Sequence, residues 1–180
     1  MTGLLEACAL HAAGALPATL FAPGRTEGQA DIYWRHLQVA PVDVGQAVDV
    51  RDAVWLVAQV AVWRGSPGCV HAELLLVNAS GHLRPRPTAT VTGYGVQLAD
   101  AAPIPILGVL AVTTTADQDG AVQTVAELIP VGAWVGQSGD LLILDGARWE
   151  QVGDPTRQTN PAGSTLPVVQ LRRVRDGVPG

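Results

Sequence analysis

The stretch DLLILDGARWEQVGDP, residues 140–155, contains two strand patterns joined by a tight turn. Its first half is an apolar run, and Asp145 and Gly146 form the dipeptide that tolerates the positive φ angles of a type I′ turn. The returning strand alternates, so Trp149 points to the same side as the leucines across the turn. The sequence therefore predicts a β-hairpin in which Trp149 anchors a hydrophobic core.

Further strand patterns lie on both sides of this hairpin. Short strands separated by turns every eight to twelve residues or so are typical of sandwiches and barrels. The predicted fold class is mainly β, a small antiparallel β-barrel or sandwich with one short N-terminal helix over residues 3–16. The other predicted strands are residues 32–39, 48–64, 69–77, 88–98, 106–115, 121–131 and 166–175.

The predicted strand over residues 48–64 is apolar on both faces. Strict alternation puts Val54, Leu56 and Val60 on one side and Trp55 and Val57 on the other. A strand that is apolar on both sides belongs inside a sandwich or at a seam between subunits.

Two segments are expected to be loops. Residues 78–87, NASGHLRPRP, contain two Arg-Pro pairs that disfavour a helix, and residues 153–165 are rich in turn formers. The first of these marks a domain boundary. We expect an N-terminal extension or subdomain over residues 1–80, made of the helix and antiparallel strands, and a β-barrel over residues 88–180.

The composition favours self-assembly over nucleic-acid wrapping. The chain has 180 residues, of which 48% are hydrophobic and 15% charged, and a net charge of −5. So few charges leave apolar surface that copies of the chain or a partner can bury. The negative net charge argues against a protein that wraps DNA, because phosphate binding rests on clustered cations, and it leaves room for a local basic strip. All 11 basic residues are arginine, which we interpret first as genomic codon bias.

The two cysteines, Cys8 and Cys69, lie far apart without a CxxC spacing, so reduced buried thiols are expected. The N-terminal segment lacks the basic region of a signal peptide, and no apolar run is long enough to span a bilayer. We expect a protein that is kept inside a cell, or inside a particle assembled there, without membrane contact.

One motif suggests an enzyme. His71-Ala72-Glu73 matches the first half of a zinc deaminase signature, in which the histidine binds zinc and the glutamate transfers protons. The Pro-Cys-x-x-Cys half is missing, because the chain has only Cys8 and Cys69. Asp117 and Asp119 resemble the start of a calcium loop, but the twelfth position is a leucine. The sequence therefore predicts no catalytic residue, no metal site and no cofactor.

One basic cluster, formed by Arg172, Arg173 and Arg175, lies near the C-terminus. A solvated strand end is the simplest interpretation, and electrostatic contact with nucleic acid or an acidic neighbouring subunit is the functional alternative. Polar residues of the loop at 153–165 add donors and acceptors for a partner. The predicted oligomer or partner interface comprises Arg157, Gln158, Asn160, Arg172, Arg173 and Arg175.

Between about residues 113 and 177 the sequence resembles the head-closure, or head-to-tail stopper, proteins of long-tailed bacteriophages. The resemblance covers about a third of the chain and consists of short motifs in a conserved order of strands and turns. These motifs are Thr114–Gly120 (Thr-x-x-Asp-x-x-Gly), Ala121–Val131, Asp140–Gly146, Trp149–Pro155 and Leu166–Val174. Family members are usually shorter, so the first 80 or so residues are an addition whose role the resemblance does not imply.

The resemblance implies a non-enzymatic virion structural protein with a small β-barrel. Such a subunit assembles with copies of itself into a ring, hexameric or dodecamer-related, at the neck of the virion. There it closes the DNA exit channel below the portal or adaptor protein and provides the surface to which the tail attaches. The implied partners are therefore the portal or adaptor, the tail terminator or tube protein, and packaged DNA in the channel. Assembly would occur in the host cytoplasm.

Two alternatives remain open at this point. The first is another virion structural subunit, such as a tail-completion or capsid decoration protein, because these also use β-rich folds of low charge. The second is a zinc-dependent hydrolase built around His71 and Glu73.

Overall fold

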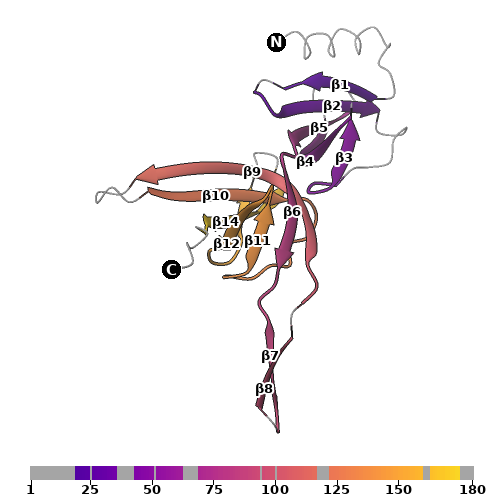
Figure 1. Ribbon diagram of the computed structural model, residues 1–180. Helices are drawn as coiled ribbons and strands as arrows, with labels where there is room; N and C mark the ends of the chain where they lie inside the picture. The colour runs from indigo at the N-terminus through magenta and orange to yellow at the C-terminus, as the bar shows by residue number, and fades with distance from the viewer. Residues whose placement is uncertain are drawn as a thin grey trace. The chain divides into compact units, whose positions relative to one another are not determined.

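The computed structural model describes residues 19–24, 26–35, 43–50, 52–62, 69–93, 95–99, 101–116, 122–159 and 163–174. These residues form 14 β-strands, coloured in chain order in Figure 1. The helix predicted over residues 3–16 lies outside the described residues. Within the described part there is no helix that is long and apolar enough to cross a membrane.

The chain divides into two compact units. The first comprises residues 1–77 together with 158–166, and the second comprises residues 78–157 together with 167–180. The segment 158–166 thus groups with the N-terminal unit, although it is far from that unit in sequence. Within the first unit, the Leu166 side chain lies 3.8 Å from the place that a Cβ on Gly45 would occupy.

The first unit is built on one antiparallel sheet. Its strand order is β1-β2-β5-β4-β3, and one face carries a core of Ala30, Ile32, Val57, Ala72 and Leu74. The strands are β1 (Thr19–Pro23), β2 (Gln29–Arg35), β3 (Ala47–Val50), β4 (Ala53–Val62) and β5 (Cys69–Leu76).

Strand β4 does not alternate strictly, which corrects the predicted facing of its side chains. The register with β5 shifts between Val57 and Gln59, so one extra residue is accommodated as a β-bulge. Trp55, Val57 and Val60 therefore belong to the same core, although strict alternation separates Val60 from the other two. Leu56 is also fully buried, so both faces of the strand carry buried side chains, as predicted.

The second unit is a closed antiparallel β-barrel of six strands. Its order is β10-β9-β6-β11-β12-β14, and pairing between β10 and β14 closes it. The closing ladder runs from Val125 opposite Arg172 to Leu128 opposite Val169. The strands are β6 (Ala79–Arg84), β9 (Ile104–Ala116), β10 (Val122–Pro130), β11 (Leu141–Leu144), β12 (Ala147–Gln151) and β14 (Thr165–Arg173). The prediction of a mainly β chain with a small antiparallel barrel is confirmed.

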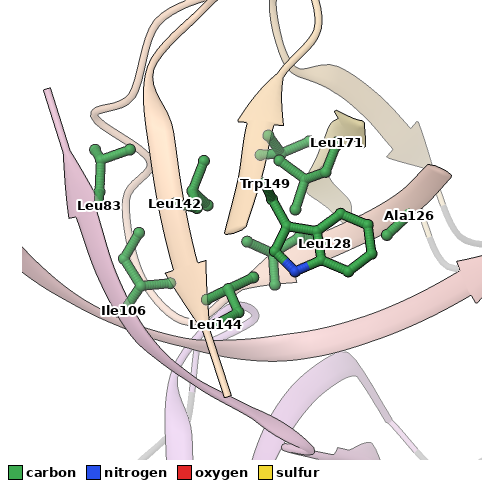
Figure 2. Packing of buried hydrophobic residues seen from close by; sticks show 9 residues of the cluster. Leu83, Ile106, Ala126, Leu128, Leu142, Leu144, Trp149 and Leu171 are labelled. Carbon is green, nitrogen blue, oxygen red and sulfur yellow. The ribbon is translucent and has the colours of Figure 1, made fainter. Parts of the chain in front are cut away.

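The barrel interior is filled by alternate residues of its strands. Figure 2 shows the indole of Trp149 beside Leu128, with leucines from β6 and β11 across the interior. This packing follows from the period of two in each strand, which sends every second side chain inward. The buried cluster consists of Leu83, Ile106, Ala126, Leu128, Leu142, Leu144, Trp149, Val169 and Leu171.

The central hairpin matches its prediction. Asp145 and Gly146 have φ angles of 48° and 79°, as a two-residue turn of this type requires. Leu142 lies directly opposite Trp149, and Trp149 is only 2% exposed. The turn is also fastened to β6, because the Asp145 carboxylate accepts hydrogen bonds from the backbone nitrogen and the hydroxyl of Ser80, both at 3.3 Å.

The loop predicted over residues 78–87 is wrong, because most of it is strand β6. This strand pairs with β9 on one side and β11 on the other, and its Leu83 is fully buried. The glycine in this segment, Gly81, has a structural role in the strand. A Cβ at Gly81 would overlap the carbonyl oxygen of Ile143, so glycine allows β11 to approach this closely.

Two further predictions need correction. The single strand predicted over residues 88–98 is a hairpin of β7 (Thr88–Thr92) and β8 (Gly95–Ala99), which forms a two-stranded sheet of its own. Gly93 lies in the turn of this hairpin, and Gly95 begins β8 opposite Thr92. The loop predicted over residues 153–165 contains strand β13 (Thr156–Thr159), which extends the sheet next to β14.

Candidate interface on the barrel

The two arginines at the end of β14 lie just beyond its last inward-facing residue, Leu171. Arg172 points outward and donates from Nη2 to Oε2 of Glu150 at 2.7 Å, with side chains 52% and 31% exposed. Glu150 is the residue directly opposite on β12. An ion pair this exposed contributes about 0–1 kcal/mol, so it orients the guanidinium more than it stabilises the fold.

Arg173 connects this surface to the barrel core. Its guanidinium carbon lies 6.0 Å from the ring centroid of Trp149, the residue opposite it on β12. Attraction between the cation and the ring face is worth about 0.5–1 kcal/mol at exposed sites. The guanidinium is thereby held beside the rim of the barrel.

Beside these arginines lies an open groove of about 400 Å³. The pairing of β10 with β14 ends at Val125 and Arg172. The earlier residues of β10, from Val122 to Thr124, are paired with β9, and the groove forms beside them. We call it the β10–β14 groove. Its lining residues are Val122, Gln123, Thr124, Arg172 and Arg173.

The remaining predicted interface residues do not join this groove. Arg157 and Gln158 are exposed on β13, whose Thr156 hydroxyl donates to the carbonyl of Val168 at 3.3 Å. Val168 is four residues from Arg172 along β14, roughly 13 Å at the rise of a strand. Asn160 and Arg175 lie outside the described residues.

A charged row across the outer barrel was missed by the sequence analysis. Arg84 lies opposite Leu141, which lies opposite Glu150, which in turn lies opposite Arg172. Positive, apolar, negative and positive side chains therefore follow one another across four strands. Arg84 was missed because residues 78–87 were predicted to be a loop. The small or apolar residues at alternate positions 79, 81 and 83 are the signal that indicates a strand there.

At one end of the barrel a buried carboxylate organises the chain. Asp140 is 5% exposed, and its two oxygens accept hydrogen bonds from the backbone nitrogens of Arg86 (3.0 Å) and Gln137 (2.8 Å). The Arg86 side chain also donates to the carbonyl of Gly139 at 2.9 Å. Asp140 therefore joins the end of the β6 segment to the loop before β11.

A second polar contact holds the same loop against β12. Gln151 is 1% exposed; its side-chain oxygen accepts from the indole nitrogen of Trp134 at 3.2 Å, and its amide donates to Gly153. The Gly153 backbone nitrogen in turn donates to the Ser138 hydroxyl at 3.1 Å. These groups satisfy one another, which indicates a structural role.

The residues of the zinc alternative have other neighbours in the first unit. The His71 Nε2 lies 2.8 Å from an Asp31 carboxylate oxygen, and its ring stacks on Tyr33 with centroids 4.8 Å apart. Within the described ranges, no three or more histidine, cysteine or acidic side chains gather as a metal would require. Asp117 and Asp119 lie outside those ranges.

The chain was compared with known proteins at the level of family, sequence and structure. Neither the family models, nor the curated proteins, nor the solved structures contain a match to it.

Proposed function

We propose that this chain is a non-enzymatic structural subunit of a bacteriophage virion. In this role it is a ring-forming head-to-tail connector that closes the DNA exit channel below the portal or adaptor and provides the tail attachment surface. The proposal combines the resemblance to head-closure proteins with the architecture of the second unit.

The observation that carries the proposal is the closed six-stranded barrel. Four of its strands, β10, β11, β12 and β14, come from the segments that resemble head-closure proteins. The residues that carry the resemblance thus form four of the six barrel strands, while β6 and most of β9 come from outside it. Fold alone does not fix function. The proposal therefore depends on the fact that the segments with the resemblance supply most of the barrel strands.

Ring assembly requires that each subunit present two different surfaces, because a ring forms from repeated head-to-tail contacts. The second unit has a groove beside Arg172 and Arg173 and a separate hairpin, β7–β8. Large apolar side chains are also exposed on its strands, with Val91 at 81% and Val112 at 52%. These features support a subunit that is completed by its neighbours.

The charge pattern supports contact with proteins more than tight binding to DNA. The net charge is −5, and Arg172 is already paired with Glu150. Both features weaken phosphate binding, which depends on available cations. We therefore propose that the main partners are the portal or adaptor protein and the tail protein, and that DNA passes through the channel.

The experiment is to assemble particles without this chain and then to supply it in trans. We expect packaged heads that lose DNA and carry no tails, and normal tailed particles once the chain is restored. Tailed particles that lack the chain and keep their DNA would contradict the proposal and favour a decoration role. Stoichiometric zinc in the purified protein would favour the hydrolase.

A further inference from the structure

The hairpin β7–β8, residues Thr88–Ala99, has no strand partner in the described part of its own chain. The two strands pair from Thr88 opposite Ala99 to Thr92 opposite Gly95, and neither pairs with any other described strand. Figure 1 shows the hairpin extending beyond the ends of β6 and β9. We call it the arm.

The chemistry of the arm suits strand addition. Its sequence, TATVTGYGVQLA, contains no charged residue and no proline, which are two of the devices by which proteins protect exposed strand edges. Val91 is 81% exposed. A lone two-stranded hairpin is at best marginally stable in water, and a further strand stabilises it. Both edges of the arm therefore favour pairing with another β-strand.

The β10–β14 groove offers a matching edge. Near Gln123 and Thr124, β10 is paired with β9 on one side, and on the other side its ladder with β14 has ended among the residues that the structure describes. This part of β10, residues 122–124 (VQT), is uncharged and contains β-branched residues like the arm, and such residues pair favourably across strands. Arg173 beside it is a pure donor that can reach carbonyl oxygens of an added strand.

Arm and groove lie at opposite ends of strand β9. The arm emerges where the β6–β9 ladder ends, at Leu83 opposite Ile104. The groove lies beside Thr124, whose partner on β9 is Thr114. Ten residues separate Ile104 from Thr114, roughly 33 Å along a strand. The arm extends away from this strand (Figure 1), so it cannot reach the groove of its own barrel.

We propose that the arm of one copy docks in the β10–β14 groove of a second copy and adds a strand to β10. Each copy then contributes its arm to one neighbour and its groove to another. Repeated head-to-tail contacts of this kind close into a ring when the rotation between copies permits. The closure into a ring rests on the proposed function. The docking of the arm rests only on the features of the arm and the groove. Nucleic acid does not fit the arm, because the arm brings no cation.

The first test is disulfide cross-linking between two single-cysteine variants, Val91→Cys and Gln123→Cys. Each is made in a Cys8→Ser, Cys69→Ser background that retains the parent melting temperature. Docking raises the effective concentration of the two thiols, so the mixed pair should cross-link about tenfold faster than Val91→Cys mixed with Val152→Cys. Val152 is a matched control because it is exposed on the barrel, at 48%, and does not line the groove.

Three outcomes of this test would overturn the docking. Equal rates for the two mixed pairs would mean that the arm has no preferred site. Fastest cross-linking of Val91→Cys with itself would mean that two arms pair symmetrically. Rates that fall steeply with salt would indicate a charged contact instead of strand pairing.

The second test replaces residues 88–99 with a short Gly-Ser-Gly turn. Because the arm pairs with no barrel strand, the barrel should keep its melting temperature within a degree or two, while self-association weakens by about tenfold or more in Kd. Unchanged association would overturn the inference. If the arm-deleted chain still occupies the neck of particles, docking fails and the proposed function stands. If the parent chain is absent from the neck, the proposed function fails whatever the cross-linking shows.

Discussion

Trp149 is the only aromatic residue in the described core cluster of the barrel, and its burial was predictable from the hairpin. Replacing it with alanine should cost about 3–5 kcal/mol and lower Tm by more than about 10 °C in a domain of this size. The indole nitrogen has no hydrogen-bond partner among the described residues, so Trp149→Phe should cost much less. Thermal denaturation of both variants checks this, and equal losses would contradict the packing described.

Gly81 is required by the close approach of two barrel strands, which no local pattern reveals. Gly81→Ala should destabilise the barrel by about 1–3 kcal/mol or more, because the added Cβ must displace the backbone of β11. Gly93→Ala is the control, since a Cβ there meets nothing within 4 Å. Urea titration of both variants measures the difference, and a neutral Gly81→Ala would mean that β6 and β11 are not paired in this register.

Asp140 is a buried carboxylate that accepts two backbone hydrogen bonds, from Arg86 and Gln137. Asp140→Ala leaves both donors without a partner and should cost about 1–3 kcal/mol. Asp154→Ala, at an exposed position, should change stability by less than about 0.5 kcal/mol. If the two variants have the same urea midpoint, Asp140 does not organise the barrel end.

At the scale of elements, hairpin chemistry was predictable and strand pairing over long distances was not. Asp145 and Gly146 specify their turn by backbone preference alone, so the central hairpin was found from sequence. Strand β6 was missed because the segment with the two Arg-Pro pairs was interpreted as a loop, and the contacts that make residues 79–84 a strand come from β9 and β11. Tertiary pairing thus overrides local preference.

The same limit applies to the candidate interface. Arg172 and Arg173 were found because they cluster in sequence, whereas Arg84 joins their row only through pairing across β11 and β12. Arg157 was grouped with them because it lies in a polar segment, and the structure places it on β13, outside the groove beside Arg172. The groove is invisible in the sequence, because it exists only where the β10–β14 ladder ends.

The bulge in β4 gives a test at this scale. Deleting Ala58 removes the extra residue opposite β5 and leaves Trp55, Val57 and Val60 on the same face. We therefore expect a folded protein that loses no more than about 1–2 kcal/mol. Under strict alternation the same deletion turns every later residue of β4 to the other face. Circular dichroism and urea unfolding distinguish the two, and an unfolded variant would contradict the bulge.

At the scale of the whole molecule, the two units raise different expectations. The second unit contains the barrel, the groove and the arm, and it carries the resemblance on which the proposed function rests. The first unit is a separate sheet, for which the resemblance implies no role. Removing the arm tests assembly without disturbing either core, because its strands pair only with each other among the described residues.

The central claim is that this chain is a neck connector, and its copy number per particle tests that claim most directly. Quantitative mass spectrometry of purified particles, with the major capsid protein as the internal standard, counts the copies. A ring at a single neck predicts about a dozen copies or fewer per particle, in a fixed number set by closed symmetry. Hundreds of copies, as a subunit distributed over the capsid surface would show, or no copies at all, would contradict the account.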